Sequence, residues 1–91
     1  MRIKIEQVFQ ISGRGAVAVI DQVTANPVGR TLCATVFCPD GSQMIVNKVF
    51  KEWVLSRHPK PFEKESYLLY GIDKSQIPEG SFIEVYVTPG G

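Results

Sequence analysis

The sequence predicts an all-β fold, a small barrel or sandwich built from six short antiparallel strands. Apolar and polar residues alternate with a period of two along most of the chain, which is typical of half-buried strands. Glycine- and proline-containing turn signals interrupt this alternation at short intervals, as they do in sandwiches and barrels. The 91 residues are enough for one modest core.

The first predicted strand covers residues 2–11. Its apolar side chains share one parity, so we expect them to lie on one face of the sheet with polar residues on the other. These side chains are Ile3, Ile5, Phe9 and Ile11. The run of Gly13, Arg14 and Gly15 predicts a turn, because glycine adopts positive φ without steric cost.

Two more strands are predicted before the middle of the chain. Valine and small residues fill residues 16–24, which we expect to form a strand buried on both faces. A third strand is expected over 30–38, where Leu32, Ala34 and Val36 share one face. The Pro-Asp-Gly sequence at 39–41 is a tight-turn signal and ends this strand.

The fourth strand is predicted over residues 42–50, with an extension to Val54. The apolar spacing within 47–56 also fits a short helix, so that alternative stays open. Two prolines in 57–61 exclude regular structure there, because each removes a backbone donor and restricts the residue before it.

The last two strands are expected over residues 65–70 and 81–88. Between them, Asp73 is placed to cap a single helical turn at 73–76. Residues 88–91 are predicted to be a flexible tail. A closed antiparallel barrel is favoured because it leaves no unpaired edge in a chain with so little core.

Composition limits the class of protein. With 44% apolar residues, 21% charged residues and a net charge of +1, we expect one globular domain over residues 1–91. No apolar run resembles a signal peptide or a membrane span, so we expect a cytoplasmic protein without membrane partners. Cys33 and Cys38 are expected to be reduced thiols rather than a disulfide.

Groups for catalysis are sparse, and we expect no enzyme, no cofactor and no metal site. The serines lie outside any nucleophile elbow, and His58 is the only histidine. The glycines of 13–15 do not form a phosphate loop, because the remaining residues of such loops are missing. Asp21 interrupts an apolar run, and it is either a carboxylate at the barrel rim or part of a binding site.

Charge is uneven along the chain. Residues 48–64 carry five cationic side chains against Glu52 and Glu63, whereas residues 65–91 carry one lysine against four acidic side chains. Aromatic and cationic side chains in the basic part could stack on bases and meet phosphates. The alternative is that the aromatic residues belong to the core and that the lysines form a solvated face. The candidate binding residues are Lys48, Lys51, Trp53, Arg57, His58, Lys60 and Lys64.

Two segments resemble the second, β-barrel domain of bacterial elongation factor Tu and related translational GTPases. Residues 8–17, VFQISGRGAV, are similar to its Val-Phe-x-Ile-x-Gly-Arg-Gly-Thr-Val hairpin. Residues 67–80, YLLYGIDKSQIPEG, are similar to its Leu-Leu-Leu-Arg-Gly-Ile-x4-Ile-x-x-Gly segment, with Tyr70 in place of the arginine. Residues 62–66 differ from the family's stretch beside its tRNA site, so no residue of that site is carried over.

The resemblance implies a closed six-stranded barrel. It places Gly13, Arg14 and Gly15 in a hairpin turn, and Gly71 and Gly80 at the two ends of a short helical turn that plugs the barrel. It also implies a stand-alone binding module that engages a protein partner, such as a translation GTPase, a ribosome-associated factor or a toxin. An RNA- or tRNA-binding barrel that uses residues 48–64 is the alternative.

Overall fold

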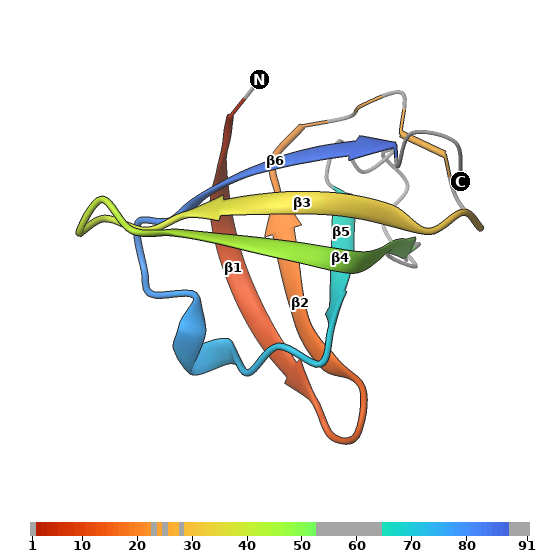
Figure 1. Cartoon of the computed structure of the whole chain (residues 1–91), viewed down its shortest axis with the longest axis horizontal. Helices are drawn as coiled ribbons and strands as arrows, with labels where there is room; N and C mark the ends of the chain where they lie inside the picture. Colours follow the sequence, from red (N-terminus) through yellow and green to blue (C-terminus); the bar gives the residue numbers. More distant parts are fainter. Residues whose placement is uncertain (1, 23, 25, 28, 53–64, 88–91) are drawn as a thin grey trace, which may run out of the picture.

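A computed structural model describes residues 2–22, 24, 26–27, 29–52 and 65–87 (Figure 1). It contains six β-strands and one turn of 3₁₀-helix, which confirms the all-β prediction. In chain order they are β1 (Ile3–Ile11), β2 (Gly15–Ile20), β3 (Leu32–Phe37), β4 (Gln43–Glu52), β5 (Glu65–Tyr70), η1 (Lys74–Gln76) and β6 (Phe82–Val87).

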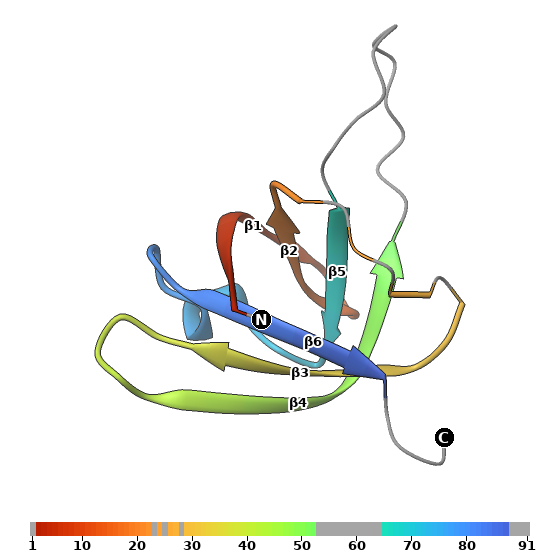
Figure 2. The same cartoon turned by 90° about the horizontal axis from the view of Figure 1, so that it is seen from above.

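The six strands form one closed antiparallel barrel in the order β1-β2-β5-β4-β3-β6. Figure 2 shows the sheet curving back on itself until β6 meets β1. That last pairing is the shortest, with Ile3 opposite Ile83 and Lys4 opposite Phe82. One backbone hydrogen bond extends it, from the amide of Ile5 to the carbonyl of Ser81 at 3.0 Å. The prediction of a barrel with no free edge is therefore confirmed.

The strand ends differ slightly from the predicted ones. β2 ends at Ile20, and the exposed residues Asp21 and Gln22 follow it. Residues 47–52 belong to β4, so the alternative of a helix from residue 47 is wrong for this part of the chain. The rest of that alternative, the strand extension to Val54 and the predicted tail at 88–91 lie outside the described residues.

β1 corrects the prediction that Ile3, Ile5, Phe9 and Ile11 share one face. The register against β2 shifts between Ile5 and Gln7, which marks a β-bulge. One extra residue reverses the inward and outward positions of everything that follows it. Val8 consequently packs against the core, whereas Phe9 is 48% exposed and Ile11 is 37% exposed.

In the core, small side chains of β2 lie beside larger ones of the neighbouring strand β5. Ala16, Ala18 and Ile20 of β2 point inward, opposite Tyr67 and Leu69 of β5. All five are fully buried or almost so. The two alanines leave room for the tyrosine ring and the leucine, so these neighbouring strands interlock at the close packing typical of protein interiors.

One end of the barrel is closed by the segment that contains η1. Ile77, which follows η1, is 4% exposed and belongs to the core. Ile72, which precedes η1, is partly buried and packs against the core. Asp73 caps the turn, since its carboxylate accepts a hydrogen bond from the amide of Ser75 at 2.9 Å. The side chain of Gln76 returns to the amide of Asp73 at 2.9 Å, completing a capping box. The predicted helical turn is confirmed.

Within the described residues, no helix has the length and apolar character needed to cross a membrane.

Candidate functional site

Two of the predicted binding residues, Lys48 and Lys51, lie on β4 and face opposite sides of the barrel wall. The ammonium of Lys48 lies 4.4 Å from the centre of the Tyr70 ring on the outside. Lys51 is opposite Tyr67 and is only 12% exposed in its side chain. The other predicted residues are outside the described part of the chain: Trp53, Arg57, His58, Lys60 and Lys64.

A second bulge explains why Lys51 points inward. The register between β3 and β4 shifts, so that Leu32 lies opposite Val49 while Ala34 lies opposite Val46. β4 thus has one residue more than β3 over this interval, and both valines reach the core. Lys51 follows Val49 by two residues and shares its inward direction.

Lys51 belongs to a polar group at the end of the barrel opposite η1. We call this group the barrel-end cluster; it consists of Thr24, Asn26, Lys51, Glu65 and Tyr67. The Lys51 Nζ lies 2.6 Å from Oε2 of Glu65. It also donates to the backbone carbonyls of Asn26 at 2.8 Å and Thr24 at 3.4 Å. The lysine therefore fastens the segment after β2 to the start of β5.

Glu65 is the centre of the barrel-end cluster. Its carboxylate accepts hydrogen bonds from the amide of Thr24 at 3.0 Å and from its hydroxyl at 2.8 Å. It accepts a third from the Tyr67 hydroxyl at 2.8 Å. Among the described residues, no buried side-chain nitrogen or oxygen is left without a partner. A complete network of this kind holds a local structure in place.

The surroundings shift the pKa of two groups in this cluster. Burial alone would raise the pKa of Glu65, but the Lys51 ammonium and the hydrogen bonds from Thr24 and Tyr67 outweigh it, so the pKa is lowered. Burial raises the pKa of the Tyr67 hydroxyl, and the neighbouring Glu65 charge adds to this effect. Glu65 is thus a carboxylate and Tyr67 a neutral phenol at neutral pH.

A pocket of about 290 Å³ adjoins the barrel-end cluster. Its apolar wall comes from Ile3, Ile20 and Val85, on three different strands. Its remaining lining residues carry amide or hydroxyl groups: Gln22, Thr24, Asn26 and Tyr67. Shape, apolar walls and a few convergent polar groups are the features of small-molecule sites.

A different surface lies on the outside of the barrel. Phe9, Val17, Leu68 and Phe50 stand directly opposite one another on β1, β2, β5 and β4. Phe9 is 48% exposed, Tyr70 is 44% exposed and Ile11 is 37% exposed. We call this group the outer apolar surface; Phe9, Ile11 and Tyr70 are its exposed residues, Phe50 is half-buried, and Val17 and Leu68 are buried.

Two cationic side chains border the outer apolar surface. Lys48 lies over the Tyr70 ring, as described above. Arg14, in the turn between β1 and β2, reaches Oε1 of Glu52 at the end of β4 at 3.8 Å. Both members of that ion pair are well exposed, so the pair contributes little stability and a partner can displace it.

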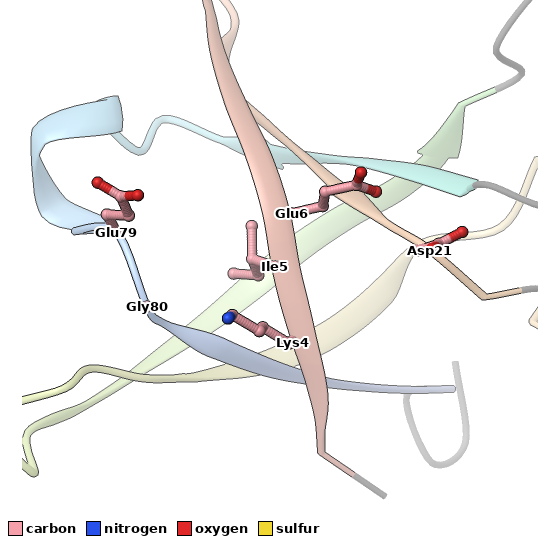
Figure 3. Close-up of a pocket in the computed structure, with 6 residues that line it drawn as sticks. All are labelled: Lys4, Ile5, Glu6, Asp21, Glu79 and Gly80. Carbon is pink, nitrogen blue, oxygen red and sulfur yellow. The ribbon is translucent and has the colours of Figure 1, made fainter.

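Asp21 lies beside a shallow hollow of about 660 Å³ at the foot of β1. Lys4 and Glu6 of β1, Glu79 and Gly80 also line it. Figure 3 shows that the three carboxyl groups point in different directions and do not converge on one point. No group of residues in the described part of the chain is arranged to hold a metal ion. Asp21 is exposed just after the end of β2 and contributes to the lining of this hollow.

Three of the predicted turn glycines, Gly13, Gly71 and Gly80, lie in turns with positive φ, whereas Gly15 is the first residue of β2. The φ angles are 78° at Gly13, 77° at Gly71 and 91° at Gly80, and an added Cβ at Gly13 or Gly71 would meet nothing within 4 Å. At Gly15, with φ of 153°, an added Cβ would lie 2.2 Å from the carbonyl oxygen of Leu69. Gly15 is thus required by the close approach of β5 as well as by its backbone conformation.

Comparison with family models, with curated proteins and with solved structures found no match to this chain.

Sequence reasoning missed the barrel-end cluster and the outer apolar surface. Glu65 and Thr24 are 41 residues apart, so their contact depends on the pairing of β2 with β5. Phe9 and Ile11 were expected in the core, and only the bulge brings them outside. One available signal was Glu65 itself, a carboxylate at the start of a strand that is otherwise rich in apolar residues.

Proposed function

We propose that this chain is a non-catalytic binding module that engages a protein partner through its outer apolar surface. The observation that carries the proposal is the group of exposed side chains Phe9, Ile11 and Tyr70 beside the apolar residues Val17 and Leu68. Exposed aromatic side chains that form one patch on a small domain mark binding surfaces. Aromatic residues and arginine also dominate the energetics of protein interfaces.

The resemblance to the second domain of elongation factor Tu supports the same proposal. Both similar segments, residues 8–17 and 67–80, contribute side chains to the outer apolar surface. The closed barrel agrees with that resemblance. We propose a translation GTPase, a ribosome-associated factor or a toxin as the partner, and a cytoplasmic location for the pair.

RNA is the second candidate ligand, and one observation favours it. The Lys48 ammonium stacks on the exposed ring of Tyr70 at 4.4 Å, on the same face as Phe9. Proteins bind single-stranded nucleic acids with aromatic rings that stack on the bases and with cationic side chains that contact the phosphates. The net charge of +1 favours the protein partner, because strong general affinity for RNA needs an excess of cations.

Affinity capture from cell lysate with three baits tests the proposal. The baits are the native chain, a Phe9→Glu/Tyr70→Glu variant and an Ile45→Glu control, whose residue is 67% exposed on β4. We expect one protein to be captured by the native chain and the control but not by the double variant. The purified partner should then bind with an affinity at least tenfold weaker to the double variant, measured by calorimetry.

If RNA were the only ligand that the double variant failed to capture, the proposed partner would be RNA instead of a protein. The Lys48→Glu variant further distinguishes a protein partner from RNA. It should weaken RNA binding at low salt more than it weakens protein binding. Lys51→Glu is unsuitable for this purpose, because it would place a second carboxylate against Glu65 inside the barrel-end cluster. Equal capture of the same molecules by all three baits would overturn the proposed surface.

A further inference from the structure

Among the described residues, none that lines the pocket beside the barrel-end cluster carries a formal charge. It is lined by Ile3, Ile20, Gln22, Thr24, Asn26, Tyr67 and Val85. Lys51 and Glu65, the charged residues of the barrel-end cluster, pair with each other at 2.6 Å. A charged guest would leave water without meeting a counter-ion there, which is costly. The described part of the lining therefore favours an uncharged molecule.

The hydrogen bonds of the barrel-end cluster fix the orientation of the Asn26 side chain. The Tyr67 hydroxyl lies 2.8 Å from Oε1 of Glu65 and 2.9 Å from the Thr24 hydroxyl, so its single proton goes to one of these oxygens and it can only accept from Asn26. The Asn26 atom 3.1 Å from that hydroxyl must consequently be the amide nitrogen. This leaves the Oδ1 of Asn26 as an acceptor that bonds to no described residue.

Three further bonds hold the backbone of this segment in place. The backbone amide of Asn26 donates to the Thr24 hydroxyl at 3.2 Å, and the backbone carbonyl of Asn26 accepts from the Lys51 ammonium at 2.8 Å. The Thr24 amide is bonded to Glu65 at 3.0 Å. The polar side of the pocket is thus preorganised, which lowers the entropy lost when a ligand binds.

We propose that this pocket binds a small uncharged organic molecule that has an N–H or O–H donor on an apolar body. The donor group bonds to Oδ1 of Asn26, and the apolar body packs against Ile3 and Val85. The volume of about 290 Å³ is enough for a ligand with a single substituted ring. This site lies at the end of the barrel and does not depend on the proposed protein partner.

Three aromatic probes of equal shape test the charge preference. Benzamide is neutral, benzoate is an anion and benzamidine is a cation, and all three are small enough for the pocket. Binding is followed by NMR through the methyl signals of Ile3, Ile20 and Val85 and the backbone amide of Asn26. We expect benzamide to give saturable shifts at these signals with a Kd of about 1 mM, which is ordinary for so small a ligand. The charged probes should bind at least tenfold more weakly.

Two variants and one control complete the test. Val85→Phe fills the apolar side and leaves every hydrogen bond of the cluster in place, and Asn26→Ala removes the acceptor. Each should weaken benzamide binding at least tenfold, while Ile45→Ala on exposed β4 should leave it unchanged. Equal shifts with all three probes, no saturation with benzamide, or native affinity in the well-folded Val85→Phe variant would each overturn the proposal.

Discussion

Lys51 and Glu65 form an ion pair of 2.6 Å within the barrel wall, and both side chains are almost buried. They lie on neighbouring antiparallel strands, one just before the end of β4 and the other at the start of β5. The pair is completed by donors and acceptors from Thr24, Asn26 and Tyr67. The ion pair and its hydrogen bonds thus join three separate segments of the chain.

We predict that the double change in this pair destabilises the protein by less than the sum of the two single changes. Glu65→Gln leaves the Lys51 cation without its counter-ion, and Lys51→Met leaves the Glu65 carboxylate without its own. Breaking one side of a buried pair should lower the free energy of unfolding by about 3 kcal/mol. The double variant should lose clearly less than the sum of the singles, as measured by urea unfolding. Strict additivity would contradict the coupling.

The same pair should make stability depend on pH in the acidic range. The pKa of Glu65 is lower in the folded protein than its ordinary value of 4.5, so the folded state binds this proton more weakly. Its contribution is complete above pH of about 4.5 and is lost as the pH falls through the lower, folded pKa. The urea midpoint should therefore fall on acidification below that value.

Glu65→Gln is the control for this pH dependence. It removes the titrating group, so its urea midpoint should change less steeply over the same range. A smaller slope should remain, because hydrogen bonds from Ser42 and Ser75 also lower the pKa values of the exposed carboxyl groups of Asp40 and Asp73. Identical pH profiles for the native chain and the variant would exclude Glu65 as the main titrating group.

Gly15 and Gly13 provide a matched comparison of two backbone positions. Both have positive φ, so alanine at either should cost about 1 kcal/mol through conformation. Only at Gly15 would the new Cβ also meet the Leu69 carbonyl, at 2.2 Å. We expect Gly15→Ala to lower the thermal midpoint far more than Gly13→Ala, and Gly15→Val to be worse still. Equal midpoints for the two alanine variants would mean that β5 moves away without cost.

Ile77 and Ile45 provide a second comparison, with the same residue type in opposite environments. Ile77 is 4% exposed where the η1 segment closes the barrel, whereas Ile45 is 67% exposed. Ile77→Ala should lower the free energy of unfolding by about 2–4 kcal/mol because it leaves a cavity. Ile45→Ala should change it by less than about 0.5 kcal/mol. Similar losses in urea unfolding would show that η1 does not contribute to the core.

The strands of this barrel are predictable from sequence because each has its own alternation and its own turn signals. The bounds predicted for β5 match those observed, residues 65–70. The directions of side chains beyond a bulge are not predictable in this way, because the bulges in β1 and β4 depend on pairing with other strands. This is why Phe9 was expected inside and Lys51 on an open surface.

The candidate sites were less predictable than the fold for a related reason. Each is assembled from segments that are distant in sequence, such as Thr24 with Glu65, or Phe9 with Leu68. A charge count identifies a basic stretch but not which of its lysines has a carboxylate partner. For Lys48 and Lys51, three residues apart, the difference is whether the side chain stacks on Tyr70 or pairs with Glu65.

The short pairing between β1 and β6 gives the closed sheet a seam. Ile3 and Lys4 meet Ile83 and Phe82 there, while β3 and β6 pair over six positions. Opening a barrel at its shortest ladder breaks the fewest hydrogen bonds, so local unfolding should begin at this seam. The molecule would then present two fresh strand edges, each able to accept a strand from another chain. The closed barrel has no free strand edge, whereas the form opened between β1 and β6 has two.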